Sequence, residues 1–178
     1  CIFVCFSCDE IHVPKPKAFL SLEYPKAAYI ESSLDLPFSF ETNTLAHLTI
    51  SKKSNILEGV ILRYPTLKAA VFINYKKVDN SVEKYISDAR AMTQKHLQIA
   101  DEISERKYEN AQQSMYGMFY DLKGNVASQT QFYVTDSTNH FISGALYFET
   151  KPNYDSILPA ISYIQKDLMH FIETLRWN

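Results

Sequence analysis

Three residue types that can form a hydrolytic triad occur in one short stretch, at Asp136, Ser137 and His140. A triad needs its nucleophile and base oriented within hydrogen-bond reach, which a tight turn seldom allows. With Thr138 and Asn139, these residue types instead bond backbone N–H groups and tolerate left-handed conformations, which would fix the register of two strands. An exposed polar turn on a rigid sheet is also a common place for a contact. All five residues are therefore candidate partner-binding residues.

Metal and cofactor chemistry find no support in the sequence. The histidines are widely scattered, without paired ligands at helical or turn spacing, and they lie at His12, His47, His96, His140 and His170. The few glycines form no phosphate-binding loop. We expect no metal site, no cofactor and no catalytic activity.

The N-terminus contains all the cysteines of the chain, at Cys1, Cys5 and Cys8. The apolar run that ends at Cys8 is typical of a secretory signal whose cysteine is lipidated after cleavage behind a small residue. We interpret residues 1–7 as the tail of that signal peptide and residues 8–17, with two prolines, as a lipidated N-terminus and tether. The alternative is a buried N-terminal strand with structural cysteines.

The composition limits the number of domains and the kinds of partner expected for the rest of the chain. Its 178 residues, 46% of them hydrophobic, suffice for one well-buried core, so we expect residues 18–178 to form a single domain. A formal net charge of −2 gives no general attraction to nucleic acid. Because no cysteine follows Cys8, packing alone must stabilise that domain.

Periodicity predicts strands in the N-terminal half and then a helix. The clearest alternation runs from Leu67 to Lys76. Asn80 and Glu83 form a capping-box-like start, followed by apolar residues at helical spacing, namely Val82, Tyr85, Ala89, Met92, His96, Ile99 and Ile103. We expect one long central helix here, with His96 as a hydrogen-bonded core residue.

Strands return in the C-terminal half. Residues 113–121, 126–135 and 140–148 are separated by turn formers at 122–125 and 136–139, which predicts a three-stranded antiparallel meander. The last of these strands is apolar on both sides, as a central strand covered on both faces would be.

A second helix is expected at the C-terminus, ending near Trp177. Its early Pro159 suits a first helical turn, and its apolar stripe consists of Ile161, Ile164, Leu168, Phe171 and Leu175. Strands grouped in runs favour an α+β fold. We therefore predict an antiparallel β-sheet flanked by a long central helix and a C-terminal helix, analogous to the PsbP-like α/β/α sandwich.

Tyrosines offer a second candidate surface. Tyr116 and Tyr120 share one face of their predicted strand and Tyr133 lies on the next. An exposed aromatic strip could hold sugar rings or a partner, whereas packing under a helix would place the same residues in the core.

The most distinctive stretch of the sequence lies at the predicted meander, where residues 136–148 read DSTNHFISGALYF. This stretch closely resembles the signature of GldD, the gliding-motility-associated lipoprotein family of Bacteroidota. Similar stretches occur in order at 14–17, 36–41, 74–76, 100–103, 116–117 and 172–177. The resemblance implies a lipid-anchored envelope protein, its domain in the periplasm, that serves gliding and type IX secretion beside other lipoproteins, and it supports Cys8 as the anchor.

Two function classes follow. The first is a non-enzymatic, membrane-anchored component that supports assembly or stability of the motility and secretion machinery by contacting other envelope proteins. The second is an envelope ligand-binding domain with a pocket between sheet and helix for a peptide, glycan or lipid. A concave apolar pocket with convergent polar groups would favour the second class.

Overall fold

The computed structural model describes residues 24–32, 34–54, 56–79, 81–149 and 153–178. The predicted signal tail (residues 1–7) and the lipidated tether (residues 8–17, with Cys8) lie outside these described residues.

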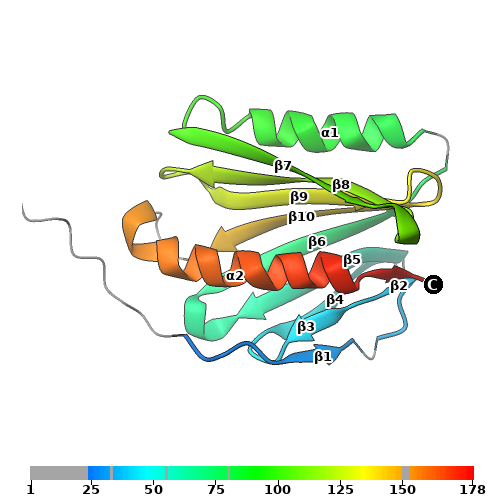
Figure 1. The fold of residues 1–178 in the computed structure, drawn as a ribbon, viewed down its shortest axis with the longest axis horizontal. Coiled ribbons are helices and arrows are strands. Elements are labelled where there is room, and N and C mark those ends of the chain that lie inside the picture. The colour runs from blue at the N-terminus through cyan, green and yellow to red at the C-terminus, as the bar shows by residue number, and fades with distance from the viewer. Residues whose placement is uncertain (1–23, 33, 55, 80, 150–152) are drawn as a thin grey trace, which may run out of the picture.

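A seven-stranded sheet in the order β4-β5-β6-β10-β9-β8-β7 dominates the fold, and all neighbouring strands are antiparallel (Figure 1). Its strands are β4 (His47–Lys53), β5 (Ile56–Tyr64), β6 (Ala69–Lys77), β7 (Glu102–Asn110), β8 (Met115–Lys123), β9 (Ser128–Thr135) and β10 (His140–Phe148). After β6 the chain passes through helix α1 (Val82–Gln94) to the far edge at β7. It then returns strand by strand until β10 pairs with β6.

Alternation along the strands gives the sheet two apolar faces. One face packs against helix α2 (Tyr154–Thr174), where Phe132 of β9 and Ile142 of β10 share a core with Ile164, Leu168 and Phe171. On the other face a smaller cluster of Tyr120, Leu122, Tyr133 and Phe141 packs with Val82 of α1.

Two short strand pairs complete the layer around α2. Strand β1 (Tyr29–Glu31) pairs with β3 (Glu41–Asn43), and β2 (Phe38–Ser39) pairs with β11 (Arg176–Trp177). The ring of Phe40 contacts that of Phe171 at 4.7 Å between centroids. These contacts bring the N-terminal strands against the C-terminal helix.

Several predicted elements are confirmed. The strand expected between Leu67 and Lys76 is β6, and the predicted meander is β8, β9 and β10 with consecutive antiparallel pairing. The C-terminal helix exists, although it ends at Thr174 because the next residues pair with β2. Pro159 lies inside α2, beyond the first helical turn in which it was expected.

The predicted fold class, a helix-flanked α/β/α sandwich with a long central helix, is wrong. The described part of the chain is mostly β, with 47% strand and 27% helix. The helix expected to continue to Ile103 ends at Gln94, and Ile103 lies in β7, which pairs with β8 along its length. His96, with its pKa lowered by burial, lies in the turn after α1 rather than on a helical stripe.

Tertiary pairing explains this difference. Ile103 fits helical spacing after Ile99, but the next four residues, Ser104 to Lys107, are all polar and continue no apolar stripe. Residues 102–110 pair with β8 along its length and satisfy its backbone groups, so that β7 forms the edge of the sheet. Helix α1 is consequently short, and Phe72 of β6 stays 38% exposed beside it.

Candidate functional site

The turn between β9 and β10 is organised around one carboxylate. Asp136 Oδ1 accepts backbone N–H groups of Thr138, Asn139 and His140 at 2.8–3.0 Å. Ser137 adopts a left-handed conformation with φ 67°, as the turn-forming role of these residues predicts. The side chains of Ser137, Thr138 and Asn139 are exposed. The structure therefore brings the five predicted residues together as one rigid, solvent-facing turn.

His140 contacts the core below the turn. Its Nδ1 lies 2.9 Å from the Tyr75 hydroxyl, and its ring stacks on Trp177 at 4.9 Å and 9°. Among the hydrogen bonds of the described residues, none joins Ser137 to His140. The arrangement therefore lacks the contact through which His140 would activate Ser137 as a nucleophile.

Replacing Asp136 by alanine should destabilise the folded protein by about 1–2 kcal/mol at neutral pH, because three backbone donors lose a charged acceptor. Burial tends to raise the pKa of Asp136, but the backbone hydrogen bonds outweigh burial and lower it. A carboxyl with a lowered pKa contributes stability above its unfolded pKa and loses that contribution as pH falls through its folded pKa. Denaturant unfolding followed by circular dichroism should show the gap between wild type and Asp136→Ala closing in acid.

Asp136→Asn is the matched control, since its amide oxygen accepts the same bonds without charge. It should lose less stability than Asp136→Ala. An Asp136→Ala deficit that stays constant into acid would contradict the proposed role of the carboxylate.

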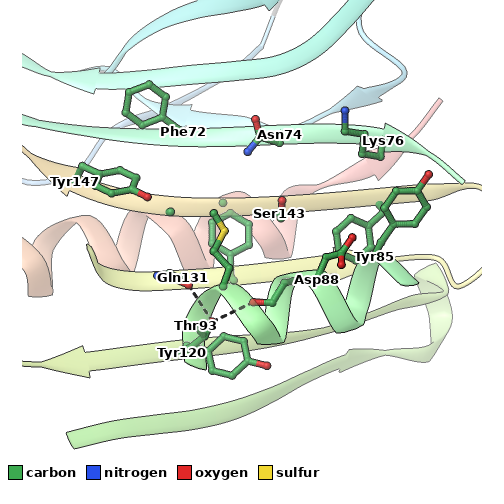
Figure 2. Close-up of a pocket in the computed structure, with 16 residues that line it drawn as sticks. Phe72, Asn74, Lys76, Tyr85, Asp88, Thr93, Tyr120, Gln131, Ser143 and Tyr147 are labelled. Carbon is green, nitrogen blue, oxygen red and sulfur yellow. Dashed lines mark hydrogen bonds between the residues drawn. The ribbon is translucent and has the colours of Figure 1, made fainter. Parts of the chain in front are cut away.

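A pocket lies beside α1 on the sheet face opposite α2, and we call it the α1 pocket. It has a volume of about 320 Å³ and is lined by β6, β10 and α1, with Tyr120 of β8 and two residues of β9 (Figure 2). Its walls are mainly apolar, with Phe72, Tyr147 and the 47% exposed Met92. The pocket thus has the position that the ligand-binding hypothesis requires, between sheet and helix.

Polar side chains converge on this pocket from two sides. Buried Thr93 donates its hydroxyl to Gln131 Oε1 at 2.9 Å (Figure 2). Asn74 and Ser143 pair across β6 and β10, and both line the pocket. The α1 pocket therefore combines an apolar interior with a few fixed hydrogen-bonding groups, as small-molecule and side-chain binding sites commonly do.

The tyrosine strip is mostly part of the core. Tyr120 and Tyr133 are buried in the cluster with α1, while Tyr116 is half-buried. Arg90 of α1 interacts with Tyr133 and Tyr120, and these contacts raise the pKa of its guanidinium. Of the two interpretations of the strip, the structure supports packing under a helix.

A buried polar network around Asp167 joins α2 to the N-terminal strands. The carboxylate is 4% exposed and accepts the Tyr29 hydroxyl and the Asn43 amide, each at 2.9 Å. The same amide donates to the Tyr163 hydroxyl at 2.9 Å. Fully buried Tyr64 lies near Asp167, but its hydroxyl reaches no partner in good hydrogen-bond geometry within the described residues.

Burial shifts the pKa values of the ionisable groups in this network. Desolvation raises the pKa of Asp167 despite its hydrogen bonds, and it also raises the pKa of Tyr29. The Tyr29 ring stacks on His170 at 3.6 Å between centroids, and His170 Nε2 lies 2.7 Å from Glu41. Perturbed pKa values mark both functional sites and structural networks. Here the partners all belong to packed elements, which supports a structural role.

The sequence carries a signal for this network, although helical periodicity alone does not reveal it. Asp167 is directly followed by Leu168 and lies three residues after Ile164, on the apolar stripe of α2. A charged residue at a buried helical position requires partners. Gln131 carries a similar signal, as a polar residue in a strand buried on both sides.

The described residues contain no group of three or more His, Cys, Asp or Glu side chains placed to hold a metal ion. Within the same part of the chain, no helix is both long and apolar enough to cross a membrane.

Comparison with protein families connects this architecture to a known group. A family model described as gliding motility lipoprotein GldD matches residues 9–177. The chain belongs to the GldD family. The resemblance noted at residues 136–148 is therefore confirmed over nearly the whole described chain.

Membership makes this GldD protein a gliding-motility-associated lipoprotein of the cell envelope, anchored to a membrane. GldD is a family of motility components and not a known family of enzymes. A comparison with curated proteins found no match.

Proposed function

We propose that this GldD protein is a non-enzymatic envelope component that supports assembly or stability of the gliding and type IX secretion machinery by contacting other envelope proteins. The match of the family model over residues 9–177 carries this proposal. Its lipid would be attached to Cys8, and its domain, residues 18–178, would lie in the periplasm of a member of the Bacteroidota.

The turn of residues 136–140 is the proposed contact surface. Its backbone is fixed by Asp136 and its base by the stack of His140 on Trp177. Thr138 and Asn139 project exposed side chains from this rigid support. A partner would find the turn already ordered, which lowers the entropic cost of binding.

A pull-down from detergent-solubilised membranes should compare the intact lipoprotein with Cys8→Ala and with a Thr138→Ala/Asn139→Ala double variant. Cys8→Ala should move the protein from the membrane to the soluble fraction, because it loses its acyl anchor. The double variant should keep the anchor and lose envelope partners by about tenfold in recovery. Its backbone caps remain, since Asp136 is unchanged.

Two results would count against the proposal. One is an intact lipoprotein that recovers no envelope protein. The other is Cys8→Ala protein that stays in the membrane fraction, which would remove Cys8 as the anchor. If the double variant recovered envelope partners as fully as the wild type, the turn would be excluded as the contact surface, and the proposed envelope role would be unaffected.

Ligand binding is the second candidate function, and one observation favours it. The α1 pocket is concave, mainly apolar and supplied with polar groups from Thr93, Gln131 and Ser143. A peptide, glycan or lipid group could occupy it, and the chemistry of its walls narrows that choice.

A further inference from the structure

An unpaired polar atom is buried in the wall of the α1 pocket, where neighbouring atoms leave it almost no accessible surface. Gln131 is 5% exposed, and its Oε1 accepts the Thr93 hydroxyl, but its Nε2 has no hydrogen-bond partner among the described residues. Exchanging the amide oxygen and nitrogen would pair the nitrogen with Thr93 and leave the oxygen unpaired instead. Either way, one buried amide atom lacks a partner, and such an atom is costly unless something binds it.

Aromatic rings line the same pocket as that amide. The rings of Phe72 and Tyr147 meet edge to face at 5.7 Å and 75°, and Met92 adds a thioether from α1. In Figure 2 the labelled rings of Phe72 and Tyr147 lie beside each other on β6 and β10, away from Lys76. Aromatic edges and sulfur atoms both favour contact with another flat ring.

The size and charge of the pocket restrict the occupant further. A volume of about 320 Å³ lies at the lower end of the range for ligand pockets, about 300–1,000 Å³. Lys76 and Asp88 both line the pocket with opposite charges. Because these charges oppose each other, they give the pocket no net attraction for an anionic lipid or phosphate headgroup and are compatible with an uncharged polypeptide side chain.

We propose that the α1 pocket receives a tyrosine side chain of a partner polypeptide, with the ring against Phe72, Tyr147 and Met92 and the hydroxyl bonded to the Gln131 amide after a rotation of the Gln131 side chain exposes it. A phenolic hydroxyl both donates and accepts, so it pairs with either orientation of that amide, whereas an indole N–H only donates. This inference rests on the proposed function, since it supplies the anchor residue that protein contacts commonly use.

The test uses the full chain with Cys8→Ala, so that no attached acyl group competes for the pocket. Nuclear magnetic resonance titration should compare N-acetyl-L-tyrosinamide, N-acetyl-L-phenylalaninamide, octanoate and the peptide Gly-Gly-Tyr-Gly-Gly. We expect the tyrosine amide to bind about threefold to tenfold more tightly than the phenylalanine amide, as one hydrogen bond predicts. The peptide should bind at least as tightly as the tyrosine amide.

Gln131→Met is the variant that isolates the amide. It should abolish the preference for tyrosine while leaving the phenylalanine affinity within about twofold, because only the hydroxyl loses its partner. The fold should tolerate the change, since the Thr93 hydroxyl can still donate to the Ala89 carbonyl, at 3.3 Å, and methionine fills irregular apolar space. Unfolding followed by circular dichroism checks this.

Ser143→Leu adds apolar bulk to the pocket from a half-buried position and should weaken both aromatic amides at least tenfold. Thr49→Leu, at an exposed position of β4, is the matched control and should weaken neither.

Three outcomes would overturn the inference: no preference for tyrosine, a preference that persists in Gln131→Met, or octanoate binding more tightly than tyrosine. Exclusion of the peptide while the free amide binds would also overturn it, because the occupant would then be a small phenolic molecule. None of these probes involves the envelope partner, so failure here is distinct from an empty pull-down.

Discussion

Replacing Asp167 by alanine is expected to lower the free energy of unfolding by about 3 kcal/mol. The carboxylate binds Tyr29 of β1 and Asn43 of β3 from the middle of α2. Alanine leaves the Tyr29 hydroxyl without its acceptor, and the buried Asn43 amide keeps only its bond to the Tyr163 hydroxyl. Denaturant unfolding monitored by circular dichroism would measure the loss.

Glu173→Ala is the matched control, because it removes an exposed carboxylate from the same helix. It should change stability by no more than about 0.5 kcal/mol. Asn43→Asp/Asp167→Asn exchanges the two partners and should recover part of the stability lost in Asp167→Asn. Equal losses in Asp167→Ala and Glu173→Ala would refute the stabilising role of the network.

The pH dependence of Asp167→Ala provides a second check. Because burial raises the pKa of Asp167, the native state keeps this proton over a pH range in which the unfolded state has released it. Stability of the wild type therefore falls as pH rises through that range. Asp167→Ala lacks this decline, so the gap between the two proteins should narrow from acid towards neutral pH, opposite to the trend expected for Asp136→Ala.

Gly59→Ala should be similarly damaging, with a loss of about 3 kcal/mol. Gly59 lies next to the bulge in the pairing of β4 with β5, at φ 155°. A Cβ there would come within 1.9 Å of the Ile73 carbonyl oxygen and 2.8 Å of the Asn74 Cα. Both atoms are backbone of β6, so β5 and β6 would have to separate.

Gly144→Ala tests whether a collision with a side chain costs less stability than the collision with backbone expected for Gly59→Ala. The three atoms nearest its Cβ would all belong to the ring of Phe132, the closest being Cε1 at 2.3 Å. That ring can move, so Gly144→Ala should cost less than Gly59→Ala, and adding Phe132→Leu should restore part of the loss. If Gly59→Ala were as stable as the wild type, the close approach of β5 and β6 would be incorrect.

Local patterns predicted much of the sheet. Short turn sequences separate β8 from β9 and β9 from β10. The hydrogen bonds that Asp136 accepts in the second turn come from residues only a few positions further along the chain. Such features depend on neighbours in sequence, which a single chain displays directly.

Features that depend on distant pairing were not predicted. Helical spacing predicts a helix as far as Ile103, whereas pairing with β8, which no local pattern reveals, makes residues 102–110 a strand. The network of Asp167 with Tyr29 and Asn43 joins residues more than 100 positions apart. The α1 pocket likewise combines residues from separate strands and a helix, which no periodicity reveals.

The stack of Trp177 on His140 has a practical consequence. Trp177 is the sole tryptophan of the sequence, and it pairs with Phe38 in the β2–β11 ribbon while its ring covers the base of the turn. The fluorescence emission of Trp177 therefore reports on the surroundings of the turn of residues 136–140. A shift of that emission on mixing with a purified partner that lacks tryptophan would register a contact at the turn without any dye or tag.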